Sequence, residues 1–153
     1  MHRQLTVPRS GSCKRPPISD GLMPIFGAPL PLPDHAACAV RAALEMIEMM
    51  ALFNLERVAA AKSPIKIGVG IASGEMVAGY TGTQSRATYT CIGDTVNLAT
   101  RLEARTKVAQ RPILIDAATR AALAEGVPVD AVGAVQFSGK AAPVEVFSVR
   151  VTG

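Results

Sequence analysis

An amide and a guanidinium stand one helical turn apart in the stretch TYTCIGDTVNLATRLE, residues 88–103. The stretch first alternates like a strand, breaks at Gly93, and then has helical spacing, with Asp94 expected at the N-cap. Asn97 and Arg101, spaced i and i+4, therefore point the same way. Near a strand end, such a pair suits a ribose and a phosphate. Spacing alone, however, favours a solvated polar pair on an amphipathic helix.

Hydrophobic periodicity predicts the elements that would position this pair, in an α+β arrangement of a sheet with helices packed on it. A long amphipathic helix is expected from Asp34 to about Ser63, and another from a cap at Asp116 to Gly126. The expected strands and the final hairpin occupy residues 22–26, 65–82, 87–92, 111–115 and 131–151.

The charge of the chain is concentrated at its start. The net charge is +4 over 153 residues, and residues 1–17 contribute four basic side chains and no acid: Arg3, Arg9, Lys14 and Arg15. Twelve basic and twelve acidic residues follow, so a basic footprint for nucleic acid is absent and we expect no nucleic-acid partner. Residues 1–17 are predicted to be a disordered basic lead-in, with a transit peptide as the alternative.

Cysteine spacing and hydropathy favour a cytoplasmic protein. Cys13, Cys38 and Cys91 form no CxxC and no zinc-like spacing with His2 or His35, so we expect reduced thiols. The N-terminus lacks the apolar core of a signal peptide, and charged residues interrupt the other apolar runs. We therefore predict a cytoplasmic chain without a membrane segment.

Two common nucleotide-binding patterns fail in this sequence. GVGIASG, with Gly68, Gly70 and Gly74, leads into another strand, whereas a dinucleotide fingerprint requires a helix N-terminus there. No G-x-x-x-x-G-K-[ST] motif occurs in the chain. Any nucleotide chemistry must use another arrangement.

Four motifs in order closely resemble the class III adenylate and guanylate cyclase catalytic domain, of the bacterial adenylate cyclase type. They are SDGLMPIFGAPLPLPDHAACAVRAA, IGVGIASGEMVAGYTG, YTCIGDTVNLATRLE and FSGKAAPVEVF. The resemblance covers about residues 18–151. It implies the ferredoxin-like class III cyclase fold, an α+β fold with a mixed or antiparallel sheet, here lacking the first β-α-β segment.

The resemblance implies a reaction in which the ribose 3′-hydroxyl of ATP attacks the α-phosphate, releasing pyrophosphate and closing 3′,5′-cyclic AMP. In the family, two Mg²⁺ or Mn²⁺ ions assist at the interface of two cyclase domains, in intracellular signal transduction. A homodimer, or a heterodimer with another cyclase domain, is therefore the expected assembly.

The resemblance also assigns roles to individual residues. Asp20 matches one of two metal-binding aspartates, Asn97 the residue that orients the ribose, and Arg101 the arginine that meets the transferring phosphate. Thr90 matches the position that reads the base, which favours ATP, and its neighbour Cys91 must face the other way in a strand. Lys140 matches a polyphosphate contact, although a solvated hairpin lysine is an equal alternative.

The chain departs from the family before Asp20. The family's first metal aspartate, in an F-x-D-[IV]-x-x-F motif, has no counterpart there, and its purine-reading lysine falls on Pro16. We therefore predict little or no activity for this chain alone, and marginal stability because a strand is missing. The alternatives are a non-catalytic pairing module that lends Thr90, Asn97 and Arg101 to a complete partner, and a decayed fragment.

Overall fold

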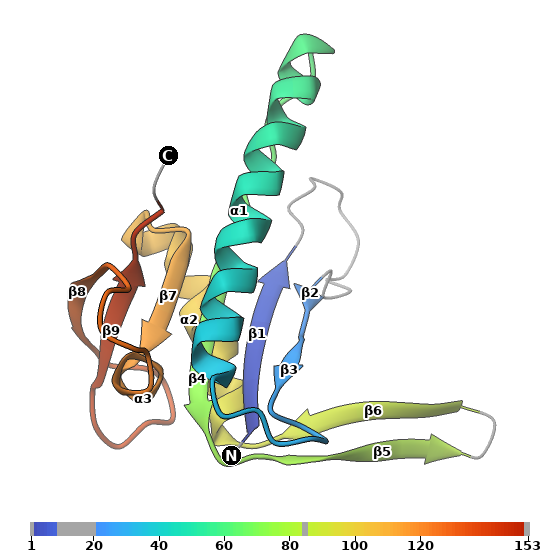
Figure 1. Ribbon diagram of the computed structural model, residues 1–153, viewed down its shortest axis with the longest axis vertical. Coiled ribbons are helices and arrows are strands. Elements are labelled where there is room, and N and C mark those ends of the chain that lie inside the picture. The colour runs from blue at the N-terminus through green and yellow to red at the C-terminus, as the bar shows by residue number, and fades with distance from the viewer. Residues whose placement is uncertain (1, 9–20, 84–85, 152–153) are drawn as a thin grey trace.

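The computed structural model describes residues 2–8, 21–83 and 86–151, without the side chains of 2–8 and 80–90. Three helices and nine strands occur in these ranges, coloured by residue number in Figure 1. The helices are α1 (His35–Ala59), α2 (Asp94–Ala109) and α3 (Ala117–Ala121). The strands are β1 (His2–Pro8), β2 (Gly21–Leu22), β3 (Ile25–Phe26), β4 (Val69–Gly74), β5 (Val77–Thr83), β6 (Arg86–Ile92), β7 (Ile113–Asp116), β8 (Val129–Val135) and β9 (Val144–Val149).

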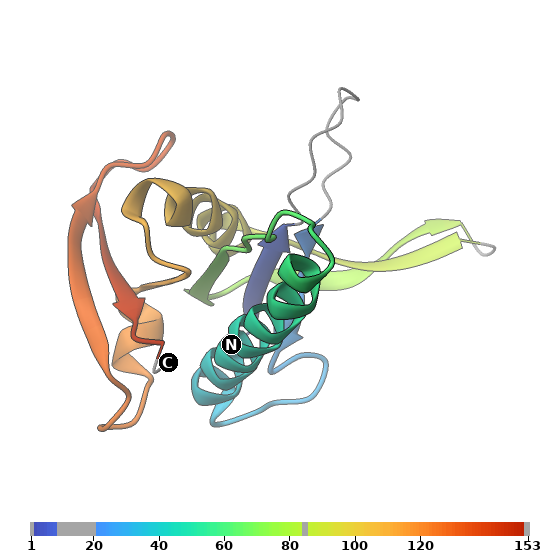
Figure 2. The same ribbon diagram turned by 90° about the horizontal axis from the view of Figure 1, so that it is seen from above.

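The main sheet is mixed, as the sequence predicted. Its order is β2-β1-β4-β7-β9-β8, and β3 also pairs with β1. Strands β4 and β7 are parallel, whereas the other pairs are antiparallel. Strands β5 and β6 form a separate antiparallel pair, which extends away from the main sheet as an arm (Figures 1 and 2).

The prediction that residues 1–17 are disordered is wrong for residues 2–8. These residues form β1, which pairs with β4 from His2–Gly74 to Thr6–Gly70 and so covers an edge of β4. The stretch QLTV alternates apolar and polar residues, a period that the basic composition obscured. Because β1 occupies the position expected to be empty, the unpaired sheet edge no longer argues for marginal stability. Residues 9–17 lie outside the described part of the chain.

Helices α1 and α2 pack on opposite faces of the sheet (Figure 2). Odd-numbered residues of β4 and β7 form one buried cluster with the first half of α1, and even-numbered residues form another with α2. Strand side chains alternate between the two faces, which explains the division. Packing on the sheet therefore fixes the position of α2 and of the polar residues that α2 carries.

Three glycines let α2 lie directly on β4. A Cβ at Gly70 would lie 2.2 Å from the Ala99 carbonyl oxygen, and one at Gly68 would lie 2.0 Å from Oγ1 of Thr106. At Gly74 it would lie 2.5 Å from Oγ1 of Thr95. The glycines of GVGIASG therefore permit close helix–strand packing, and no helix N-terminus follows them as a dinucleotide fingerprint requires.

The expected helices are confirmed with changes at their ends. Asp116 caps α3 by accepting a hydrogen bond from the Thr119 N–H at 2.8 Å, but this helix ends at Ala121. Asp94 is the first residue of α2, and Gly93 occupies the N-cap. The C-terminal half of α1 extends beyond the sheet, and no helix in the described ranges has the length and apolarity needed to cross a membrane (Figure 1).

Candidate active site

The first turn of α2 is attached to the strand layer below it. Strand β6 leads into α2 through Gly93, and the Thr95 hydroxyl donates a hydrogen bond of 2.9 Å to the carbonyl of Glu75. Glu75 lies in the connection between β4 and β5. The start of α2 therefore has a fixed position relative to the base of the β5–β6 arm.

Arg101 lies against the loop that joins β8 and β9. A Cβ at Gly139, where φ is +76°, would lie 3.4 Å from Nη2 of Arg101. Nη1 of Arg101 is buried and has no hydrogen-bond partner among the described residues. A buried donor without an acceptor costs about 1–3 kcal/mol, which an incoming anion would offset.

Lys140 comes from the same loop and forms an ion pair with Asp94 on the first turn of α2. The Lys140 ammonium hydrogen-bonds the Asp94 carboxylate and holds its pKa below the usual range, and the positive charge of Arg101 adds a smaller effect. Lys140 is 22% exposed and Asp94 is 70% exposed. The loop and helix therefore bring two cations and one carboxylate together.

Replacing Lys140 with alanine is expected to raise the pKa of Asp94 toward its ordinary value of about 3.9. Because the pKa of Asp94 is lowered in the folded state, the pair stabilises the folded state fully at pH values above the unfolded pKa. This stabilisation is lost as the pH falls through the lowered folded-state pKa. A carboxyl ¹³C titration by NMR measures the shift. An unchanged Asp94 pKa in Lys140→Ala would show that the ion pair does not form in solution.

Asn97 lies one turn before Arg101 on α2, with an exposed side chain. Its backbone N–H bonds the carbonyl of Gly93 at 3.2 Å, in the first turn of the helix. The amide is thus free to meet solvent or a ligand. Asn97 and Arg101 thus lie on α2 with Asp94, the residue that Lys140 pairs with.

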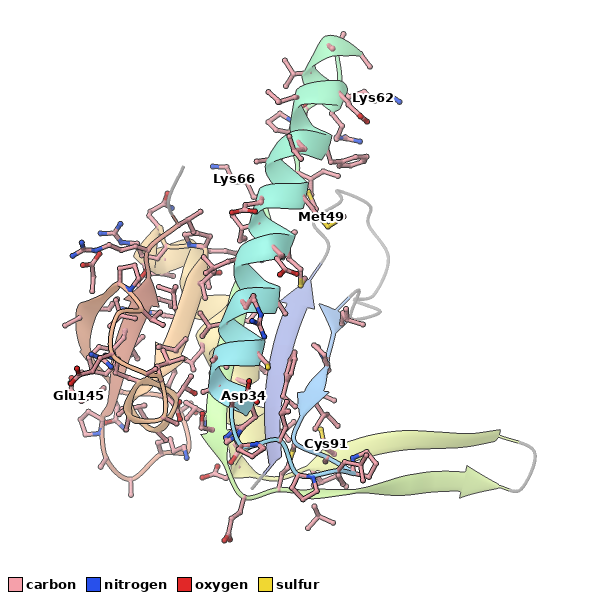
Figure 3. The ribbon with its side chains drawn as sticks, in the orientation of Figure 1. Asp34, Met49, Lys62, Lys66, Cys91 and Glu145 are labelled. Atoms are coloured by element: carbon pink, nitrogen blue, oxygen red, sulfur yellow. The ribbon has the colours of Figure 1, made fainter. Side chains whose placement is uncertain are left out.

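Thr90 lies on β6 opposite Gly79, and its side chain is outside the described part. The adjacent Cys91 is buried, 4% exposed, with its Sγ 4.0 Å from Sδ of Met23. Burial raises the pKa of the Cys91 thiol. Figure 3 shows Cys91 near the inner end of β6. Cys91 therefore belongs to the interior.

The described residues do not fit a two-metal site. Asp20 lies outside them, and within the part of the chain that the structure describes no three His, Cys, Asp or Glu side chains gather to hold an ion. The Asp94 carboxylate, whose pKa the charge of Arg101 also lowers, is paired with Lys140. Mg²⁺ and Mn²⁺ require oxygen ligands that this set does not supply.

Sequence reasoning missed two contributions to this site. It treated Asp94 as a helix cap, whereas the side chain pairs with Lys140, 46 residues away. It also did not foresee that the turn at Gly139, where φ is +76°, lies against the Arg101 guanidinium. The adjacent residues Gly139 and Lys140 indicated a turn that carries a cation. Only the fold shows that this turn meets α2.

Comparison with known families identifies the arrangement. The model of the adenylate and guanylate cyclase catalytic domain matches residues 12–150. The chain belongs to this family. The match begins within the lead-in that we expected to be unrelated to the family, and it extends through α2 and the β8–β9 hairpin of this cyclase domain.

Relatives and solved structures agree with this membership. Adenylate cyclase 1 of Rhizobium meliloti is 30% identical over 130 residues, which cover 85% of this chain and 20% of that protein. The cyclase domain thus spans only a fifth of that curated relative. The crystal structure of the guanylyl cyclase Cya2 superposes with a TM-score of 0.85 at 25% identity, covering 99% of this chain and 92% of Cya2.

The adenylyl cyclase CyaB from P. aeruginosa also shares the fold, with a TM-score of 0.80 at 23% identity, covering 100% of this chain and 98% of that one. Both adenylyl and guanylyl cyclases therefore have this fold. The class III cyclase fold is confirmed, while the choice of nucleotide must come from individual residues.

Proposed function

We propose that this cyclase domain converts ATP to 3′,5′-cyclic AMP and pyrophosphate at a site shared by two cyclase domains. The observation that supports it best is the buried, unpartnered Nη1 of Arg101 beside the β8–β9 loop. A guanidinium with an unused donor is suited to the oxygens of a phosphate, because its planar fork matches their geometry. The role of Arg101 is to stabilise negative charge on the transferring phosphate.

The other residues follow from their positions around Arg101. The exposed amide of Asn97 would orient the ribose, and Thr90 would contact the adenine edge. Lys140 would exchange Asp94 for a polyphosphate oxygen when the nucleotide enters, since Asp94 faces solvent and is easily released. These are the proposed binding and positioning roles of the three residues.

Two arguments favour a shared site. The residues proposed to hold the nucleotide lie on β6, α2 and the β8–β9 loop, whereas the described residues include no carboxylate cluster for the divalent ions that the family requires. The β5–β6 arm extends from the sheet beside α2, where a second domain could approach (Figure 1). Oligomers with two-fold symmetry place the same patch of both chains at the interface.

Incubating the purified chain with ATP and Mn²⁺ or Mg²⁺ tests the reaction, with cyclic AMP measured by mass spectrometry. We expect slow product formation, because the described residues supply an incomplete donor set. A rate per chain of about 10 s⁻¹, the median for enzymes, would contradict the predicted weakness. GTP in place of ATP tests the assignment of Thr90, and faster turnover of GTP would contradict it.

Replacing Asn97 with alanine is expected to lower the rate of cyclic AMP formation by about 10- to 100-fold, because the ribose hydroxyl loses its orientation. Thr100→Ala is the matched control, since Thr100 is exposed on α2 and its hydroxyl bonds only the Val96 carbonyl, at 3.1 Å. Equal rates for the Asn97 variant and this control would remove Asn97 from the site.

Because the described residues gather no carboxylate cluster, a second candidate is a pairing module that lends its nucleotide-holding residues to a complete partner. Mixing this chain with an active cyclase domain that lacks its own Asn–Arg pair tests this function. Restored cyclic AMP formation that requires Arg101 of this chain would support it. No restoration, together with activity of this chain alone, would exclude it.

A further inference from the structure

A hollow lies at the C-terminal end of α2. It has a volume of about 470 Å³ and is formed by the middle of α1, the segment before β4 and the C-terminal end of α2. Gln110 at its edge is thirteen positions after Asn97, which is roughly 20 Å along a helix. Its size lies within the roughly 300–1,000 Å³ usual for small-molecule sites.

The walls of this hollow are largely apolar. Ile47, Met50 and Ala51 come from α1, while Ile65, Ile67 and Pro112 come from the segments leading into β4 and β7. Met49, which is 70% exposed, lies on the opposite side of α1 from Lys66, a residue of the hollow (Figure 3). The hollow is therefore separate from the exposed side chain of Met49.

The uncharged polar groups of the hollow are already used within the protein. The Asn54 amide bonds the backbone of Ile65 twice, donating to its carbonyl at 2.8 Å and accepting from its N–H at 2.7 Å. The Thr106 hydroxyl donates to the Glu103 carbonyl at 2.6 Å, and the Gln110 amide donates to the Lys107 carbonyl at 2.8 Å. Few neutral groups remain for a ligand.

Three cations remain: Lys66, Lys107 and Arg111. Over the described ranges, none of their side chains has a hydrogen bond or an ion pair, and no acidic residue lines the hollow. Two acids outside the hollow interact with these cations more weakly than an ion pair. Arg111 helps to lower the pKa of Asp130, which accepts a hydrogen bond of 2.8 Å from Nε of Arg150. Lys107 partly offsets the effect of burial on the pKa of Glu103, one turn before it on α2.

Part of this charge suits the helix end, since cations stabilise the C-terminus of α2. That explanation covers Lys107 and Arg111. It does not cover Lys66, which follows α1 and reaches the same hollow from a different segment. Convergence of cations from two segments on an apolar wall is the pattern expected for an anionic head group with a hydrocarbon tail.

We propose that this hollow binds a small amphipathic carboxylate, with the hydrocarbon tail against the α1 wall and the carboxylate between Lys66, Lys107 and Arg111. A phosphate ester fits less well, because the neutral donors that would satisfy its additional oxygens are already bonded. The site is independent of the nucleotide site, so it stands or falls separately from the proposed cyclase activity.

Octanoate, below the concentration at which it aggregates, is the probe for the full chain, with octylamine as the chain-matched cation. Calorimetric titration and amide NMR shifts measure binding. We expect saturable octanoate binding with shifts at residues 50–54, 65–67 and 106–112, and no saturable binding of octylamine. Failure of octanoate to saturate, or equal binding of octylamine, would overturn the proposal.

Two variants test the location. Ala51→Phe fills the hollow and is expected to abolish saturable binding, while Lys66→Glu with Lys107→Glu should weaken it at least about tenfold. Lys62→Glu is the matched control, because Lys62 is exposed at the far end of α1 outside the hollow (Figure 3). Wild-type affinity in the Ala51 and double-lysine variants, or an equal loss in Lys62→Glu, would place binding elsewhere.

Discussion

Replacing Arg101 with alanine is expected to reduce cyclic AMP formation by about 10²- to 10³-fold, the effect of removing one preorganised donor that acts on developing charge. Arg101 is held by α2 on one side and by the Gly139 turn on the other. Its Nη1 has no acceptor among the described residues, so the donor is available for a phosphate oxygen. The rate is measured at saturating ATP, with folding of the variant checked by circular dichroism.

Two further variants separate charge from geometry. Arg101→Lys keeps the charge but loses the planar fork, and it should remain at least about tenfold slower than wild type. Arg41→Ala removes an exposed arginine of α1 and should leave the rate unchanged. If Arg101→Ala turned over ATP at the wild-type rate, the role of this arginine in the reaction would be disproved.

The largest effect on stability is expected from Gly70→Ala. The new Cβ would lie 2.2 Å from the Ala99 carbonyl oxygen and 2.4 Å from the Glu103 nitrogen, and both are backbone atoms of α2. Because neither can rotate away, the helix must move off β4 and expose the cluster around Leu102. We expect a loss of about 3 kcal/mol or more in the free energy of unfolding, measured in urea.

Gly79→Ala is the matched control for this substitution. Gly79 lies in β5, and a Cβ there would meet nothing within 4 Å. Its free energy of unfolding should stay within about 0.5 kcal/mol of wild type. Equal stability of the Gly70 and Gly79 variants would mean that α2 does not pack on β4 as described.

Local pattern predicted most elements of this fold. The 3.6-residue period of α1 and the apolar run in β7 located both elements. The period did not report burial along the whole of α1, because Leu55 and Val58 of its apolar face are exposed. The strand β1 was missed, because its pairing with β4 depends on an edge that no local pattern describes. The short α3 was extended too far, since Asp116 marks where that helix begins and only packing decides where it ends.

Site residues that are close in sequence were predicted, whereas a contact between residues distant in sequence was missed. Asn97 and Arg101 lie on one helix, so their spacing and the motif around them were sufficient to select both. The Lys140–Asp94 pair joins residues that are distant in sequence, and a helix cap explained Asp94 without it. Strand alternation says only that Thr90 and Cys91 face opposite ways, so the match to the family was needed to choose Thr90. The burial of Cys91 agrees with that choice.

Formation of cyclic AMP from ATP by the purified chain, followed as a function of chain concentration, tests the central claim most directly. The account predicts slow, Arg101-dependent formation whose rate per chain rises with concentration, because a shared site exists only in the assembled pair. Absence of cyclic AMP at every concentration, or a rate that Arg101→Ala leaves unchanged, would contradict it.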